Sequence, residues 1–230
     1  MERKHAFIEG ENYHIYSRGV EKRIVFNNDR EYRRFMLLLL LCNSKETIKM
    51  ANILKKYRGE PSLLAFEQEA KGLGEETLVD ILAYALMPTH FHLIVRGRTA
   101  SGISRFMLKI MTAYSMYFNI KYQRSGPLFT RPFRSKHIDS DEYFRWVFAY
   151  VLLNPLELFQ TGWKEAGLQD VGKAKDFMNS YRYSSFQDYF GQRRPESSIL
   201  SSDVLPTTLN EIQTIDDLLQ QLASTSEETQ

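Results

Sequence analysis

The chain has 230 residues, of which 43% are hydrophobic and 25% are charged, as in an ordinary soluble globular protein of one or two domains. A single cysteine, Cys42, excludes an internal disulfide and fits a reducing cytoplasm. The N-terminus lacks the apolar core of a signal peptide, and the longest apolar run, 35–42, is too short to cross a bilayer. We therefore expect a cytoplasmic protein with no membrane partner.

The net charge is only +2, but the charges are unevenly distributed. Residues 81–138 contain no Asp or Glu, whereas residues 195–230 contain seven acids and no Lys or Arg. The central stretch carries nine cations: Arg96, Arg98, Arg105, Lys109, Lys121, Arg124, Arg131, Arg134 and Lys136. Such a stretch indicates a polyanionic partner such as nucleic acid. The alternative is a solvated surface whose charges are balanced by acids from elsewhere in the fold.

The N-terminal third predicts one strand and one helix. Alternation of β-forming residues predicts a strand over 12–18, closed by Gly19. Asp29 is expected to cap a helix that ends near Asn43. Residues 44–76 are polar and helical in character but are broken by Gly and Pro, so we interpret them as an insertion between core elements.

The central region predicts a β-hairpin and two more helices. In chain order the expected elements are strands over 78–87 and 90–96, a helix over 101–122, an extended basic segment over 128–138, and a helix over 140–153 capped by Ser140. This order predicts an α+β fold with a mostly antiparallel sheet and helices packed on it. Beyond it we expect an aromatic cluster at 181–190 that docks on the core, and a short acidic helix over 210–222.

A His-Phe-His triplet lies on the second strand of the hairpin. Side chains alternate along a strand, so His90 and His92 share one face while Phe91 points to the other. We expect the histidine face to be exposed, where two imidazoles can bind a divalent metal. The triplet alone is a weak signal, and structural or chance histidines are an equal alternative.

A second candidate is the pair formed by Tyr150 and Asn154, which lie four residues apart on one helix and so can face one target. Tyr143, Trp146 and Val147 form an apolar stripe with Tyr150 at helical spacing. By this pattern alone, a tyrosine packed in the core is the favoured interpretation.

Five segments, taken together, resemble the single-tyrosine HUH transposases, and most of all the branch associated with repetitive extragenic palindromes. They are HIYSRGVEKRIVF, MPTHFHLIV, AYSMYFN, GPLFTRPFRS and YVLLNP, running in order from His14 to Pro155, with a weaker continuation at YRYSSFQDY. The combination of Met-Pro-x-His with a later Tyr-x-x-x-Asn-Pro is specific, whereas either piece alone is not.

The resemblance implies a ferredoxin-like antiparallel sheet with a tyrosine-bearing helix across the histidine face. It implies Mg²⁺ or Mn²⁺ bound by His90, His92 and a polar residue of that helix, which at the matching position is Asn154 where many relatives carry Gln. The matching nucleophile is Tyr150. The transposase domain is expected over 1–160, with the insertion at about 44–76, followed by a C-terminal extension with an acidic tail over 161–230.

The implied function is a metal-dependent single-stranded DNA endonuclease and strand transferase that forms a 5′-phosphotyrosine intermediate. Its expected partner is single-stranded or hairpin DNA from palindromic repeats, and the chain can be a monomer or a homodimer. The residues expected to bind DNA are Arg124, Arg131, Arg134 and Lys136. Phe129 and Phe133 lie among them and could stack on bases, although core packing is the favoured interpretation for both.

Two other classes of function stay open. One is a non-catalytic nucleic-acid-binding regulator that keeps the fold. The other is a hydrolytic metallonuclease in which metal-bound water attacks the phosphate. Formation of a covalent protein–DNA adduct distinguishes the three.

Overall fold

The computed structural model describes residues 6–46, 52, 55–56, 68–69, 71, 77–130, 133–191 and 193–224. Most of the expected insertion at 44–76 lies outside these residues, and so does Arg131. No helix in the described ranges is both long enough and apolar enough to cross a bilayer.

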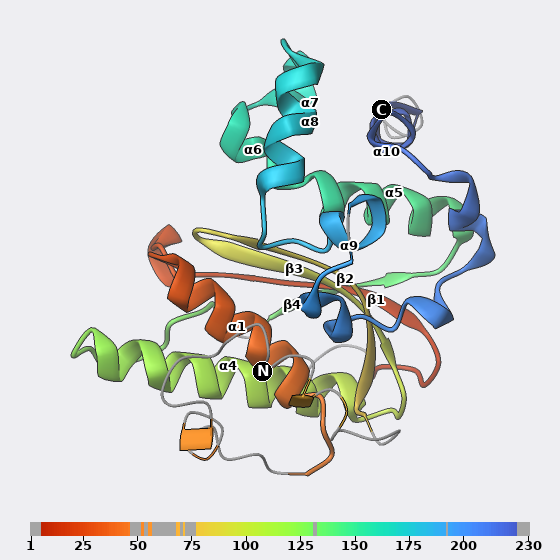
Figure 1. Ribbon diagram of the computed structural model, residues 1–230. Coiled ribbons are helices and arrows are strands. Elements are labelled where there is room, and N and C mark those ends of the chain that lie inside the picture. Colours follow the sequence, from red (N-terminus) through yellow and green to blue (C-terminus); the bar gives the residue numbers. More distant parts are fainter. Residues whose placement is uncertain are drawn as a thin grey trace.

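The centre of the fold is a four-stranded antiparallel sheet (Figure 1). Its strands are β1 (Asn12–Arg18), β2 (Val79–Met87), β3 (His90–Gly97) and β4 (Arg134–Ile138), in the order β2-β3-β1-β4. Helix α1 (Asp29–Leu41) follows β1, and helix α4 (Gly102–Lys121) follows β3. The chain order β-α-β-β-α-β with this strand order is the ferredoxin-like arrangement, so the predicted fold class is confirmed.

Two boundaries differ from those expected from the sequence. Helix α1 is capped by Asn28, whose side chain accepts a hydrogen bond from the Glu31 backbone N–H at 3.3 Å; Asp29 is already helical. The extended segment expected over 128–138 is a paired strand only from Arg134 onward, because Phe129 forms just an isolated bridge with Gly19.

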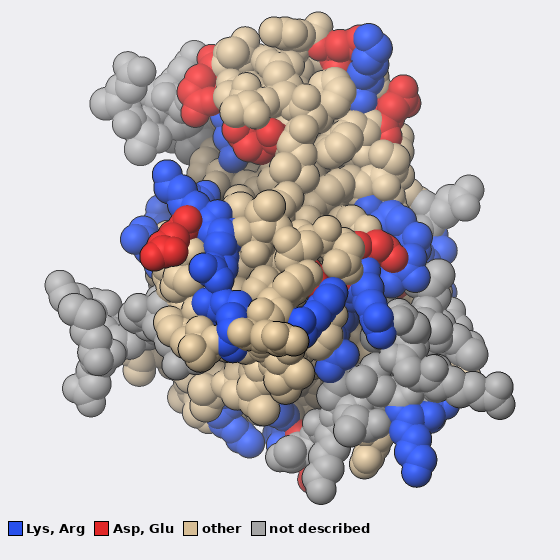
Figure 2. Space-filling model, turned by 90° about the vertical axis from the view of Figure 1, so that its left-hand side faces the viewer, with Lys and Arg blue, Asp and Glu red and all other residues tan. Residues whose placement is uncertain are grey.

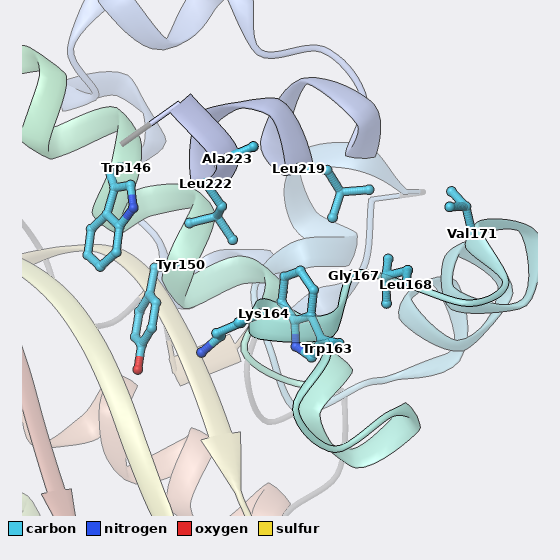
Figure 3. A pocket seen from close by; sticks show the side chains of 10 residues that line it. All are labelled: Trp146, Tyr150, Trp163, Lys164, Gly167, Leu168, Val171, Leu219, Leu222 and Ala223. Atoms are coloured by element: carbon cyan, nitrogen blue, oxygen red, sulfur yellow. The ribbon is translucent and has the colours of Figure 1, made fainter. Parts of the chain in front are cut away.

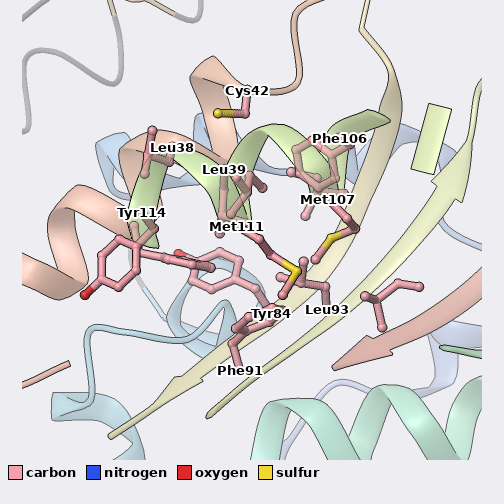
Figure 4. Packing of buried hydrophobic residues seen from close by; sticks show 14 of the residues in the cluster. Leu38, Leu39, Cys42, Tyr84, Phe91, Leu93, Phe106, Met107, Met111 and Tyr114 are labelled. Atoms are coloured by element: carbon pink, nitrogen blue, oxygen red, sulfur yellow. The ribbon is translucent and has the colours of Figure 1, made fainter. Parts of the chain in front are cut away.

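Helices α1 and α4 cover one face of the sheet and bury a largely apolar core against it (Figures 1 and 4). Phe35, Leu39, Phe91, Met107 and Tyr114 are all inaccessible to solvent there. Burying one such side chain stabilises the fold by about 1.5–3 kcal/mol.

Helix α5 (Asp141–Leu153) lies across the opposite face (Figure 1). Ser140 caps it as predicted, accepting a hydrogen bond from the Tyr143 backbone N–H at 3.2 Å. Val147, Val151 and their apolar neighbours bury one side of the helix against Ala83 and Ile94 of the sheet. This contact fixes the helix over the strands that carry the histidines.

The C-terminal segment packs beyond α5 and along the free edge of β2. Its helices are α6 (Leu156–Phe159), α7 (Trp163–Ala166), α8 (Val171–Ser180), α9 (Phe186–Phe190) and α10 (Ile215–Ser224), with 3-10 turns at Pro195–Ile199, Ser202–Val204 and Thr207–Glu211. The Leu86 N–H donates to the Tyr183 carbonyl, and the Ser185 N–H donates to the Tyr84 carbonyl, both at 2.9 Å. These bonds satisfy edge groups of β2 that would otherwise be open to another strand.

The aromatic cluster at 181–190 docks on the core, as the sequence predicted. Tyr181 and Phe186 are buried, and the Tyr181 hydroxyl donates to the Leu86 carbonyl at 2.6 Å. The acidic helix expected over 210–222 is found as α10, displaced toward the C-terminus.

Candidate active site

His90 and His92 point to the face of the sheet that α5 covers. On β3 they alternate with Phe91, which is fully buried against α1 and α4. The expectation that the histidine face is exposed was wrong: α5 lies over it, and His92 is only 6% exposed. The two imidazole centroids are 5.1 Å apart and the rings are almost perpendicular.

A third histidine, His14 on β1, belongs to the same cluster. Its Nε2 lies 2.9 Å from Nδ1 of His92, and both side chains are buried. Antiparallel pairing sets His92 opposite Tyr16, the next residue of β1 on the same face as His14. The alternation in NYHIYSR could have indicated which face His14 occupies, but the local pattern does not reveal that β1 adjoins β3.

Both histidines of β3 use Nδ1 for their hydrogen bonds, which leaves Nε2 as the ring nitrogen that can bind a metal. Nδ1 of His92 is engaged by His14, and Nδ1 of His90 lies 3.0 Å from the Thr89 hydroxyl oxygen. Within the described residues, Nε2 of either ring has no hydrogen-bond partner. Partners of this kind fix the orientation and tautomer of histidines that ligate metals.

Tyr150 of α5 faces the histidine cluster. Its ring centroid lies 5.5 Å from that of His92 and 5.9 Å from that of His14. The ring is half-buried, whereas Val147 of the same helix is completely buried. The apolar stripe expected on this helix is thus divided, and Tyr150 lies on the side that meets the histidines.

Asn154 connects the tyrosine to the histidines from the C-terminal end of α5. Its side chain is 4% exposed and lies close enough to both His90 and Tyr150 to raise the pKa of the first and lower that of the second. The two residues singled out on this helix therefore lie close together, as their spacing predicted.

Burial dominates the electrostatics of the cluster. It lowers the pKa of His90 and of His14 to about 4 and the pKa of His92 well below its usual value, helped by nearby positive charges and neighbouring imidazoles. Neutral imidazoles keep the lone pairs that metal ligation needs. Burial raises the pKa of Tyr150, while the neighbouring Asn154 side chain and the Arg18 charge act in the opposite direction.

Two cations that the sequence did not single out lie beside the site. Arg18 is paired opposite His90 in the sheet. The ammonium of Lys164, on α7, lies 4.0 Å from the centre of the Tyr150 ring. Neither residue forms a salt bridge with an acid in the described part of the chain. Both cations can therefore turn toward an anion at the site, although Glu157 and Glu165 lie near enough to Lys164 to raise its pKa.

The side chains at this site fit a divalent cation only if the amide of Asn154 joins the two histidines as a ligand. Within the described ranges no three or more His, Cys, Asp or Glu side chains are grouped to hold a metal. The free Nε2 atoms of His90 and His92 and the amide oxygen of Asn154 make a mixed set of nitrogen and oxygen donors suited to a borderline or hard ion.

The four cations expected to bind DNA have different surroundings. Arg134 and Lys136 are exposed, and their pairing with Tyr16 and His14 places them on the face of the sheet that carries the histidines. Arg124 instead lies in the loop after α4, where its guanidinium donates to Asn119 at 2.5 Å and to the Pro127 carbonyl at 3.2 Å. Arg131 lies outside the described residues.

Core packing, rather than base stacking, accounts for Phe129, which is 1% exposed and belongs to the core under α1 and α4. Phe133 is partly buried against that core. Buried acids neutralise some of the cations between residues 81 and 138. Arg96 and Arg98 bind buried Asp80, and Lys121 binds buried Glu31. Figure 2 shows further Lys and Arg side chains gathered at the level of the sheet and of the helices below it.

Comparison with known proteins identifies one matching family. The family model described as "Transposase IS200 like" matches residues 51–153, a range that contains His90, His92 and Tyr150 and ends one residue before Asn154. Among solved structures, the chain is similar to "Structure of the REP associates tyrosine transposase bound to a REP hairpin", with 15% identity over 82% of this chain and 84% of that chain and a TM-score of 0.42. No curated protein matches it.

Proposed function

We propose that this chain, whose residues 51–153 belong to the IS200-like transposase family as its motifs predicted, cuts and rejoins single-stranded DNA through a covalent link to Tyr150. A transposase-like action on DNA follows from the family, and the tyrosine chemistry is our proposal. The observation that carries it is the position of Tyr150, whose ring centroid lies 5.5 Å from that of His92, with Asn154 close enough to shift the pKa of both Tyr150 and His90.

The proposed reaction is an in-line displacement at phosphorus. The Tyr150 hydroxyl oxygen forms a bond to the phosphorus atom while the bond from phosphorus to the 3′-oxygen breaks. The products are a 5′-phosphotyrosine and a free 3′-hydroxyl, which receives the proton that the tyrosine loses. A second 3′-hydroxyl can then displace the tyrosine, because the phosphotyrosine keeps the ester bond.

Tyr150 is held for this role by its neighbours. Its hydroxyl is protonated at neutral pH, since burial raises its pKa. Asn154 and the positive charge of Arg18 both lower the pKa of Tyr150, and so favour the phenolate that develops during attack. All of these residues belong to one chain, so a monomer can contain a complete site; a homodimer is equally compatible with it.

We propose that Mg²⁺ or Mn²⁺ binds to Nε2 of His90, Nε2 of His92 and the amide oxygen of Asn154. When bound, the ion would neutralise a non-bridging oxygen of the scissile phosphate and orient the phosphate. His14 would hold the His92 ring in place through the 2.9 Å contact between their nitrogens. Arg134 and Lys136 would contact the DNA backbone on the same face of the sheet.

An adduct assay with labelled palindromic single strands tests the proposal. We expect a protein–DNA species that survives denaturation and whose gel mobility changes on protease treatment. It should not form in excess chelator. Cleaved DNA without an adduct would instead indicate a hydrolytic nuclease, and binding with neither product would indicate a regulator.

A further inference from the structure

A cavity lies beside Tyr150, on the side away from β1 (Figure 3). Its volume is about 530 Å³, within the range of small-molecule sites in proteins. Helix α5 contributes Trp146 and Tyr150, α7 contributes Trp163 and Lys164, and α10 closes the far side with Leu219, Leu222 and Ala223. Most of the lining is apolar or aromatic, and among the described residues that form it only Lys164 is charged.

Tyr150 joins this cavity to the histidine cluster. Its ring lines the cavity and stacks on Trp146 with centroids 5.3 Å apart, while its hydroxyl points away, toward the sheet (Figure 3). A phosphate that reaches the Tyr150 hydroxyl therefore brings its attached nucleoside within reach of the cavity. A base has a flat apolar face and a polar edge, which matches aromatic walls with one cation.

The position of Lys164 favours a nucleotide over a neutral apolar molecule. Its ammonium extends along the cavity wall toward the tyrosine, 4.0 Å from the ring centre (Figure 3). Within the described part of the chain no carboxylate forms a salt bridge with it, and Glu157 and Glu165 act on its pKa only from a distance. The arrangement sets a positive charge between the apolar cavity and the site where we expect the phosphate.

We propose that this cavity receives the nucleobase adjoining the phosphate that Tyr150 attacks, with Lys164 contacting the DNA backbone at its entrance. This inference rests on the proposed function. It assigns part of the C-terminal segment, α7 and α10, to substrate binding, so that the base is held by Trp163 and the leucines of α10 while α5 supplies the nucleophile.

The chain offers a direct probe, because its only two tryptophans, Trp146 and Trp163, both line the cavity. Tryptophan emission of the Tyr150→Phe variant would be titrated, without divalent metal, with octamers of dA, dC and dT. A matched octamer of abasic residues carries the same backbone charge. We expect at least one base-containing octamer to quench the emission and to bind about tenfold more tightly than the abasic octamer, as one stacked base contributes.

A pair of variants on α10 then locates the effect. Ala223 and Gln220 are both exposed, but only Ala223 lines the cavity. Ala223→Phe should fill the cavity and remove the preference for bases, while Gln220→Phe should keep it; circular dichroism checks that both fold. The proposal would be overturned by equal binding of abasic and base-containing octamers, or by identical behaviour of the two variants. It would also be overturned if anilinonaphthalene sulfonate quenched the tryptophan emission and no octamer did.

The outcome is separable from that of the adduct assay. Base-dependent quenching without any adduct in the wild-type protein would retain the cavity and remove the chemistry proposed for Tyr150. An adduct without base-dependent quenching would retain the chemistry and remove only the cavity.

Discussion

The two faces of the sheet are built from the same strands but differ in what they bury. Against α1 and α4 the strands present Ile15, Phe91 and Leu93, with Tyr114 of α4 among them, and all are inaccessible. Against α5, the same strands present Ile94 and the alanines of β2 beside the three histidines, with His14 paired to Ile94 and His92 paired to Ala85. The face under α1 and α4 is an ordinary apolar core, whereas the face under α5 is apolar only in part.

The difference shows how one face can carry stability while the other carries chemistry. Buried polar groups are costly unless they are hydrogen-bonded. His14 and His92 satisfy one another, and the Thr89 hydroxyl satisfies Nδ1 of His90. The polar cluster is therefore tolerated beneath α5 because its members are partners, and the opposite core can supply the stability that they do not.

The largest expected effect comes from making one substitution on each face. Tyr150→Phe should abolish the DNA adduct with little change in thermal stability. Tyr114→Phe should keep the adduct but lose the buried hydrogen bond from its hydroxyl to the Val25 carbonyl, 2.7 Å long, and so destabilise the fold by about 1–3 kcal/mol. Denaturant unfolding and the adduct assay on both variants measure this; equal loss of activity would remove the distinction between the faces.

Neighbouring residues of β3 provide the next test. Phe91→Ala should lower the free energy of unfolding by about 3–5 kcal/mol, because it leaves a cavity in the core. His92→Ala should cost less, about 1–3 kcal/mol, from the unpaired His14, yet it should abolish metal-dependent cleavage. Urea unfolding with cleavage measured in the native range separates the two effects. Full cleavage by His92→Ala would contradict the ligand assignment.

A smaller effect is expected from His14, which contacts a proposed ligand rather than the metal. His14→Phe keeps a flat ring but removes the contact with His92, and should weaken Mn²⁺ binding by roughly 10–100-fold. His14→Gln, which retains hydrogen-bonding groups, should recover part of that loss. Calorimetric titration with Mn²⁺ gives both values, and unchanged affinity in His14→Phe would show that the histidine is only structural.

The smallest expected effect concerns the exposed cations. Replacing Arg134 and Lys136 together by Ala should reduce the salt dependence of single-stranded DNA binding by roughly 0.7 units of slope for each lost phosphate contact. Arg105, which is exposed on α4 of the opposite face, is the matched control and should leave the slope unchanged when replaced by Ala. Fluorescence anisotropy at several salt concentrations measures the slopes, and equal slopes in all proteins would mean that β4 does not contact the backbone.

Much of the fold could be predicted because its patterns are local. The alternation of β-forming residues predicted the strand over Asn12–Arg18, and the capping residue Ser140 predicted the start of α5. The start of α1 was less certain, since Asn28 and Asp29 are both good capping residues and only the backbone geometry selects Asn28. Within the site, the spacing of Tyr150 and Asn154 predicted a shared face correctly.

The residues that were missed depend on contacts between distant segments. His14 joins the cluster because β1 adjoins β3, and Lys164 joins it because α7 folds back onto α5. The burial of the histidine face has the same origin, since it requires α5 to lie across the sheet. None of these placements follows from the pattern of either segment alone.

The central claim is that Tyr150 carries the covalent link to DNA, and peptide mapping of the trapped adduct tests it most directly. Tyr143 is the most informative alternative nucleophile, because it lies on the same helix and the Lys136 ammonium lies 4.2 Å from the centre of its ring. The adduct would be digested with nuclease and protease and the modified peptide sequenced by mass spectrometry. We predict a nucleotide on Tyr150; a nucleotide on Tyr143, with Tyr150 unmodified, would contradict the account.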